Sequence, residues 1–220
     1  MTEPQYDGLL LDHDGVLVTL CSRQALRAAA TAAFDEAGVS DPSGRDVDTI
    51  TIRVDETELC AVADRHGIDP DRLWECREAQ IERTLRRATR TGAKVPYDDV
   101  GCLDRVTVPI GIVSNNQRRI VEFVLREHGL SKYVETIRAR PPTRASLRKK
   151  KPDPTYLDAA AADLGCSNPL YVGDSESDVV AGQRAGVDTL FLRRDHNASR
   201  YLDAEPIGEI EGLDAVLEFL

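Results

Sequence analysis

The chain has 220 residues, of which 41% are hydrophobic, so it can bury a sizeable core in one large domain or in a domain with an insertion. Its net charge of -10 argues against nucleic acid and anionic membranes as partners. Membrane helices need runs of about 18 apolar residues, which are absent, and so is a secretory signal pattern. The five cysteines are scattered and never spaced C-x-x-C, which disfavours disulfides and thiolate zinc sites. We therefore expect a cytoplasmic protein.

The first predicted element is an apolar strand from Tyr6 to Leu11, which leads into a polar turn. Residues 17–94 then read mostly as helices, with one weak strand candidate at Thr49 to Val54. Capping residues and glycines mark three helices, at Ser22 to Ala37, Asp55 to His66 and Asp69 to about Arg90. We therefore expect residues 17–94 to form an inserted helical cap domain.

Strands and helices alternate in the rest of the chain. The predicted strands are Ile110 to Val113, Leu170 to Val172 and Thr189 to Leu192. The predicted helices are Gln117 to His128, Asp153 to Gly165 and Ser177 to Ala185. Such alternation indicates parallel βαβ units, so we expect residues 1–16 and 95–220 to form an α/β core domain with a doubly wound parallel sheet. Ligands of such sheets bind beyond the carboxyl ends of the strands.

Four polar stretches fall at the expected loop positions of this sheet. Each has a plain structural explanation by itself, because Asp and Gly form turns and Ser and Asn cap helices. Their combination and order are much harder to explain in that way. The four are Asp12-His13-Asp14-Gly15-Val16, Ser114-Asn115-Asn116, Lys151-Pro152-Asp153-Pro154 and Gly173-Asp174-Ser175-Glu176-Ser177-Asp178.

Taken together, these stretches resemble the motifs of the haloacid dehalogenase superfamily. Its members carry a strand into D-x-D-G-[TV], a second strand into Ser or Thr with Asn, a Lys, and a strand into G-D-x-x-x-D. The resemblance runs from Tyr6 to about Arg194, and the insertion after the first motif is similar to a helical type-1 cap. It implies a Rossmann-like core and phosphoryl-transfer chemistry. His13 stands where an apolar residue is commonest in that family.

The resemblance implies roles for the aspartates and the lysine. Asp12 would be the nucleophile that forms an aspartyl-phosphate. Asp14 would be the general acid and base, since residues two apart point the same way along an extended chain. Lys151 would balance the charge on Asp12, with Lys149 and Lys150 as rivals for that role.

The resemblance also implies a phosphate site and a metal site. Ser114 and the amide of Asn115 would bind the phosphate. Mg²⁺ prefers hard oxygen ligands. It would be held by the carboxylates of Asp12 and Asp174 and the carbonyl of Asp14, with Asp178 behind them or acting through water.

Two features narrow the activity that the resemblance implies. Dehalogenases of this superfamily lack the second carboxylate of the first motif, which is present here as Asp14, so dehalogenation is disfavoured. Phosphonate hydrolysis in the family relies on a cap lysine, and the first lysine of this chain is Lys94, at the exit hinge of the expected cap, so that activity is disfavoured too. We expect a phosphatase similar to phosphoglycolate phosphatase, acting on a small phosphorylated metabolite as a monomer or homodimer. A sugar phosphomutase of the β-phosphoglucomutase kind is the alternative, and a non-catalytic binding module is the third hypothesis.

Basic residues could also contact the substrate. Arg23, Arg27 and Arg53 in the predicted cap are candidates for gripping a second anionic group. The stretch from Arg138 to Lys151 holds seven basic residues and no acidic one, which predicts either a positive patch that attracts phosphate or a solvated loop.

Overall fold

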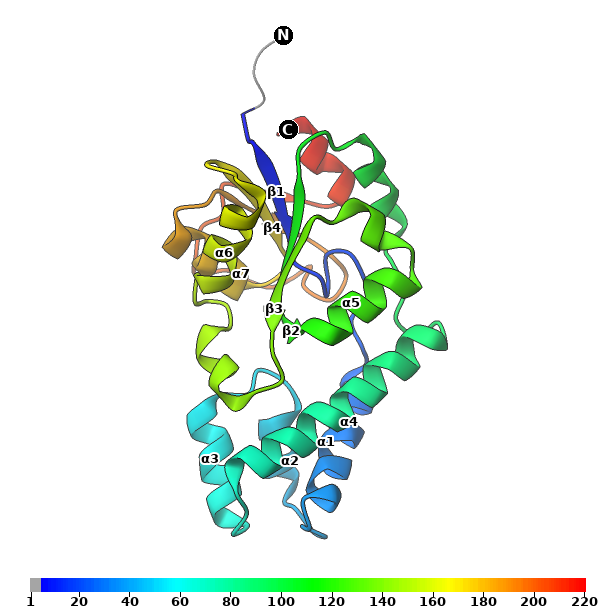
Figure 1. The fold of residues 1–220 in the computed structure, drawn as a ribbon, viewed down its shortest axis with the longest axis vertical. Helices are drawn as coiled ribbons and strands as arrows, with labels where there is room; N and C mark the ends of the chain where they lie inside the picture. Colours follow the sequence, from blue (N-terminus) through cyan, green and yellow to red (C-terminus); the bar gives the residue numbers. More distant parts are fainter. Residues whose placement is uncertain (1–4) are drawn as a thin grey trace. The chain divides into compact units, whose positions relative to one another are not determined.

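The computed structural model describes residues 5–220, which divide into two compact units (Figure 1). The sheet unit contains the chain up to Leu20 together with Val95–Ala139 and Lys149–Leu220. The helical unit contains Cys21–Lys94 and Arg140–Arg148. These ranges differ from the expected domains at residues 17–20, which group with the sheet, and at Arg140–Arg148, which group with the helices.

The sheet unit is built on one six-stranded sheet with the order β3-β2-β1-β4-β5-β6. β1 lies in the middle and pairs in parallel with β2 and β4, with Leu9 opposite Ile110 on one side and Leu170 on the other. Every residue of β1, β4 and β5 is buried, as expected for the middle of a parallel sheet. The expected fold class is confirmed. The strands are β1 (Gly8–Leu11), β2 (Ile110–Gln117), β3 (Thr136–Arg140), β4 (Pro169–Gly173), β5 (Thr189–Leu192) and β6 (Gly208–Ile210).

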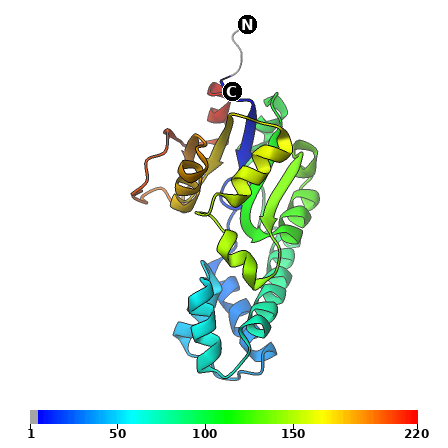
Figure 2. The ribbon, with the colours of Figure 1, turned by 60° about the vertical axis from the view of Figure 1, so that its left-hand side comes forward.

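Helices cover both faces of the sheet, with α5 on one side and α6 and α7 on the other (Figures 1 and 2). The α6 and α7 face buries Leu10, Val113 and Tyr171 of the strands against Leu157 and Ala181 of the helices. The helices are α5 (Arg118–Glu127), α6 (Thr155–Leu164) and α7 (Glu176–Ala185), with short 3-10 helices η1 (Asp98–Arg105), η2 (Leu130–Tyr133) and η4 (Leu213–Glu218). A further 3-10 helix, η3 (Arg144–Lys149), lies almost wholly in the helical unit.

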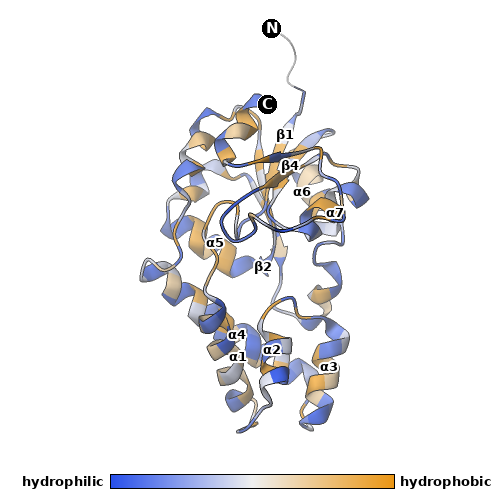
Figure 3. Ribbon diagram, turned by 180° about the vertical axis from the view of Figure 1, so that it is seen from behind, coloured by the Kyte–Doolittle hydropathy of each residue, from blue (hydrophilic) through white to orange (hydrophobic). Residues whose placement is uncertain are grey.

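Four α-helices form the helical unit, and each begins at a Ser or Asp whose side chain accepts a hydrogen bond from a backbone N–H of the first turn. Their apolar faces enclose one core around Phe34, Ile50, Leu59 and Trp74. Figure 3 shows the mixture of hydrophilic and hydrophobic residues on these helices. They are α1 (Arg23–Glu36), α2 (Gly44–Thr51), α3 (Glu56–Arg65) and α4 (Pro70–Arg90). Within residues 5–220, no helix combines the length and the apolar character that crossing a membrane requires.

The strand expected at Thr49 to Val54 is wrong, because its first half, Thr49 to Thr51, is the end of α2 and its second half belongs to no strand. Its β-branched residues suggested a strand. Val47 and Ile50, three residues apart, instead face the helical core, and Ser43 caps the helix by accepting from the N–H of Asp46. The Thr51 hydroxyl donates to the carbonyl of Val47 at 2.7 Å, so its polar group is satisfied inside the helix.

The basic stretch is paired with acidic residues, which neither sequence hypothesis anticipated. Arg144 bonds Glu56 at 2.8 Å and Asp71 at 2.7 Å, and Arg148 bonds Glu56 at 2.5 Å. Arg140, 3% exposed, bonds Glu78 at 2.8 Å. These contacts lie inside the helical unit, and the acidic partners neutralise much of the predicted positive patch.

Candidate active site

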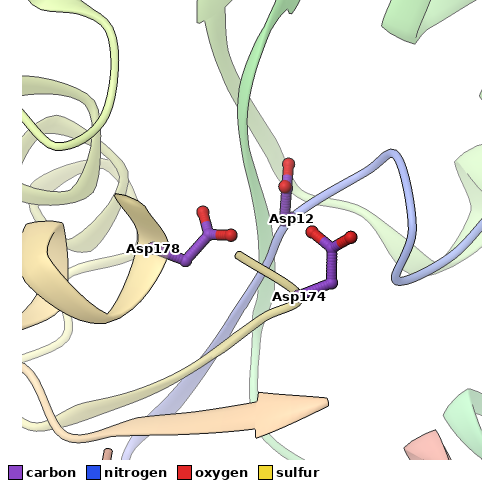
Figure 4. A group of neighbouring side chains, drawn as sticks. All are labelled: Asp12, Asp174 and Asp178. Carbon is purple, nitrogen blue, oxygen red and sulfur yellow. The ribbon is translucent and has the colours of Figure 1, made fainter. Parts of the chain in front are cut away.

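The site lies at one edge of the sheet, where β1, β2 and β4 end. Asp12 follows β1, Asp174 follows β4, and Asp178 lies in the first turn of α7. Carboxyl ends of neighbouring parallel strands meet at the same edge, which is why residues so distant in sequence converge here. Figure 4 shows the three carboxylates turned toward a common space, and one ligand atom from each lies within 4.8 Å of the others.

Asp12 is a buried carboxylate whose Oδ1 lies beside a cation. Oδ1 is 3.0 Å from Nζ of Lys151 and accepts a 2.7 Å hydrogen bond from the N–H of His13. Burial raises the pKa of Asp12 well above its usual value, Lys151 opposes that rise, and the nearby Asp178 and Asp174 carboxylates add to it. The ionised form therefore depends on positive charge supplied by Lys151 and by any bound cation.

Lys151, rather than its neighbours in sequence, occupies the site. Its Nζ is 2.7 Å from Asp178 and donates to the Val113 carbonyl and the Tyr171 hydroxyl, both at 2.9 Å. Burial disfavours its charge, but the carboxylates of Asp12 and Asp178 outweigh that effect and raise the pKa of Lys151. It therefore remains an ammonium. Lys149 is exposed and Lys150 half-buried.

Asp178 supports Lys151 and α7 at the same time. Its Oδ1 accepts from Lys151 and from the Tyr171 hydroxyl at 2.7 Å, and its Oδ2 accepts from the N–H and hydroxyl of Ser175 at 3.0 and 2.5 Å. Burial opposes its ionisation, but these donors, Lys151 above all, lower the pKa of Asp178. Since both oxygens bond protein donors, Asp178 suits contact with a cation through water.

Asp174 lies against the loop that carries Asp12. Gly15 has φ 84°, and a Cβ there would lie 2.0 Å from Oδ2 of Asp174, so this close approach requires glycine. The same oxygen is 2.6 Å from Nε2 of His196. Burial raises the pKa of Asp174, and the contact with His196 opposes that rise.

Asp14 has different surroundings from Asp12. Its side chain is 26% exposed, and its Oδ2 accepts a 2.8 Å hydrogen bond from the amide of Asn116. An accessible carboxyl that an amide helps to orient can exchange protons with a leaving group or with water. The two aspartates of the first motif are therefore divided into a buried one and an accessible one.

The two predicted phosphate ligands lie at the end of β2. Ser114 is buried, and its hydroxyl accepts from the N–H of Asn116 at 3.1 Å. The side chain of Asn115 bonds the backbone of Lys151 twice, donating to its carbonyl at 3.1 Å and accepting from its N–H at 2.7 Å. That side chain therefore positions Lys151, and a phosphate contact from Asn115 would use its backbone N–H.

The donor set of this cluster suits a hard divalent cation. Asp12 and Asp174 bring two buried carboxylates close together, and Mg²⁺ favours such oxygen ligands and usually retains waters. Two carboxylates at this spacing repel one another unless protons or a cation neutralise them. The residues present therefore fit a divalent metal.

Three contacts of the site had no signal in the sequence analysis. Tyr171 lies in β4, where the pattern showed only a buried strand residue, yet its hydroxyl joins Lys151 and Asp178. Asn116 was noted only as part of a polar stretch. His196 follows the last predicted strand, in a loop without a motif, and lines a cavity of about 890 Å³ in the sheet unit.

The chain is similar to known proteins over most of its length. The model of the haloacid dehalogenase-like hydrolase family matches residues 7–192. The phosphoglycolate phosphatase of Vibrio cholerae is 27% identical over 221 residues, which cover 96% of this chain and 92% of that protein. The pyrophosphatase PpaX of Oceanobacillus iheyensis is 33% identical over 108 residues, and this match spans about half of each protein, 48% of this chain and 49% of that one.

The fold is also shared with solved structures. CbbY from Rhodobacter sphaeroides, crystallised in complex with phosphate, has a TM-score of 0.71 to this chain. The likeness covers 94% of this chain and 95% of that one at 16% sequence identity, so it concerns the fold alone.

Proposed function

The chain is a phosphatase of the haloacid dehalogenase-like hydrolase family, and we propose that it hydrolyses a small phosphomonoester through an aspartyl-phosphate intermediate with Mg²⁺ as cofactor. One observation carries this proposal. Asp12 is buried against the Lys151 ammonium at 3.0 Å, whereas Asp14, two residues later, is 26% exposed and bonded to Asn116. One carboxylate is suited to attack and the other to proton transfer.

The first half of the reaction transfers the phosphoryl group to the protein. A carboxylate oxygen of Asp12 attacks phosphorus, a new P–O bond forms, and the bond to the leaving oxygen breaks. Asp14, protonated at this stage, gives its proton to that oxygen, so that a neutral alcohol departs. Lys151 balances the charge of Asp12 and of the transferring group, while Ser114 and the N–H of Asn115 bind phosphate oxygens.

The second half returns the protein to its starting state. Asp14, now ionised, takes a proton from water as the water attacks phosphorus, and the bond to Asp12 breaks. Inorganic phosphate leaves, and both aspartates regain their initial forms. The accessible position of Asp14 permits both proton transfers.

The metal site would be formed by the carboxylates of Asp12 and Asp174 and the carbonyl of Asp14, with Asp178 acting through water. Bound Mg²⁺ supplies positive charge that neutralises the phosphate oxygens. Lys151 is bonded to Asp178 and Asp12, so a bound cation and the ammonium would share the charge of the cluster.

Phosphoglycolate is the first substrate to test, because the phosphoglycolate phosphatase of Vibrio cholerae matches over nearly its whole length. The test is to measure phosphate release with Mg²⁺ across a panel of phosphoglycolate, sugar phosphates, nucleotides, phosphoserine and pyrophosphate. We expect release that depends on Mg²⁺. Asp12→Asn abolishes release, whereas Glu122→Gln, in an exposed ion pair of α5, leaves it unchanged.

A covalent intermediate gives a second readout. In Asp14→Asn, a substrate with a good leaving group such as an aryl phosphate still phosphorylates Asp12, but attack by water slows, so a phosphoryl adduct accumulates and is visible by mass spectrometry. No release from any substrate, or retained turnover in Asp12→Asn, contradicts the proposal. Conversion of a sugar phosphate to its isomer without free phosphate identifies a mutase instead.

A further inference from the structure

The loop after β5 contacts the metal site from outside the four motifs. Nε2 of His196 lies 2.6 Å from Oδ2 of Asp174. The next residue, Asn197, is 2% exposed, and its amide donates to the backbone carbonyl of Asp174 at 2.8 Å. Two consecutive residues therefore hold Asp174, one through its carboxylate and the other through its backbone.

This loop is itself firmly anchored. The Asn197 amide also donates to the carbonyl of Leu192 at the end of β5 at 3.0 Å, and its oxygen accepts from the N–H of Arg194 at 2.7 Å. Arg194 forms two bonds to Asp99, at 2.7 and 3.0 Å, and a third to the carbonyl of Val16 at 3.1 Å. The imidazole is thus presented from a fixed loop, and the Arg194 side chain of that loop also bonds the segment that follows Asp12 and Asp14.

We propose that His196 is a positioning residue of the metal site, which fixes one oxygen of Asp174 so that the other is presented to a divalent cation. Partners that orient a ligating carboxylate affect metal affinity by about 10- to 100-fold. This inference rests on the metal site of the proposed function. It assigns a role to a residue outside the motifs that define the site.

The opposite role is a clear alternative outcome. If His196 only neutralises the charge of Asp174 while no cation is bound, it competes with the metal, and its removal tightens binding of the metal. The two roles predict affinity changes of opposite sign. The imidazole is 23% exposed and lines the 890 Å³ cavity, so truncation to alanine enlarges a solvated hollow and leaves no void in the core.

The test is titration of the full chain with Mn²⁺, followed by the electron paramagnetic resonance signal of the free ion. We expect His196→Ala to raise the Kd about tenfold or more. His196→Gln retains an N–H donor at a similar distance from the backbone, and we expect it to recover most of the affinity. When Mg²⁺ displaces Mn²⁺ in a competition experiment, the variants are expected to rank in the same order of affinity.

A matched control comes from the helical unit. His66 makes a similar contact, with Nε2 3.0 Å from Oδ2 of Asp46, and its side chain is 17% exposed. We expect His66→Ala to leave the Kd for Mn²⁺ unchanged. An equal loss in both histidine variants would mean a general effect on folding and would overturn the inference, as would unchanged or tighter binding by His196→Ala.

Asp174→Asn separates this inference from the metal site itself. If the wild type binds Mn²⁺ and Asp174→Asn does not, the metal site is supported, whatever the result for the His196 variants. If the wild type shows no saturable binding of Mn²⁺, both the metal site and the role of His196 are refuted.

Discussion

Replacing Glu78 with glutamine tests the buried ion-pair cluster of the helical unit. Glu78 is 1% exposed and bonds two guanidinium groups, Arg77 through Oε1 at 2.5 Å and Arg140 through Oε2 at 2.8 Å. Glutamine has the same size but no charge, and only one of its two terminal atoms accepts hydrogen bonds. Two buried cations would then lack their counter-charge.

The expected loss of stability is large. Removing one partner from a buried ion pair costs about 3 to 5 kcal/mol. At a urea m-value of about 2 kcal/mol per M, the unfolding midpoint falls by about 2 M. Trp74 is the one tryptophan in the sequence, and the guanidinium carbons of Arg77 and Arg140 lie 5.1 and 4.9 Å from the centroid of its ring. Its fluorescence therefore reports unfolding of this unit directly.

An exposed ion pair provides the control for Glu78→Gln. Arg118 and Glu122 bond at 2.7 Å on α5 with side chains 54% and 43% exposed. Such pairs contribute about 0.3 to 0.5 kcal/mol, so Glu122→Gln is expected to shift the midpoint only slightly. A shift for Glu78→Gln as small as that for Glu122→Gln would show that the buried cluster tolerates uncompensated charge and would refute the reasoning.

Three further changes test other parts of the molecule. Tyr171→Phe removes the hydroxyl between Lys151 and Asp178 and is expected to lower kcat about tenfold with little change in KM, whereas Tyr6→Phe, which breaks a 2.8 Å bond to Asp188, leaves steady-state kinetics unchanged. Burial opposes ionisation of Asp46, but hydrogen bonds from Arg65, Ser43 and His66 lower its pKa from 3.8 to about 2. Its stabilising contribution of about 2 kcal/mol is therefore present above pH 4 and is lost as the pH falls toward 2, and urea titrations of Asp46→Asn are expected to lack this part of the pH dependence. Mg²⁺ is expected to raise the Tm of the wild type but not of Asp174→Asn, and removal of the ion with EDTA reverses the rise; equal rises in both proteins would place the ion elsewhere.

The sequence analysis located helices well where capping residues and glycines mark their ends. The helix expected from Asp69 to about Arg90 is Pro70–Arg90, and the helix predicted to end at Gly165 stops at Leu164, with Gly165 in the left-handed conformation that favours glycine. Strands with charged or very short sequences were missed. β3 contains Arg138 and Arg140, and β6 has only three residues, so neither shows an apolar run.

The candidate site was predictable only as far as its motifs extend. The structure brings Asp12, Lys151, Asp174 and Asp178 together, because their motifs follow the ends of adjacent strands. The contact of His196 with Asp174 depends on the path of a loop after β5, which no spacing in the sequence encodes. The pairing of Arg144 with Glu56 and Asp71 likewise required the tertiary fold.

The segment Arg140–Arg148 limits how the helical unit could be exchanged with that of a related protein, because it belongs to this unit although it is far from Cys21–Lys94 in the sequence. The chain passes between the two units four times, at Leu20, Lys94, Ala139 and Arg148. A chimaera that receives only residues 21–94 from another protein would keep arginines at 140, 144 and 148 but lose their acidic partners. A functional graft therefore has to carry both segments, and its last junction falls three residues before Lys151, so that junction has to leave the position of Lys151 unchanged.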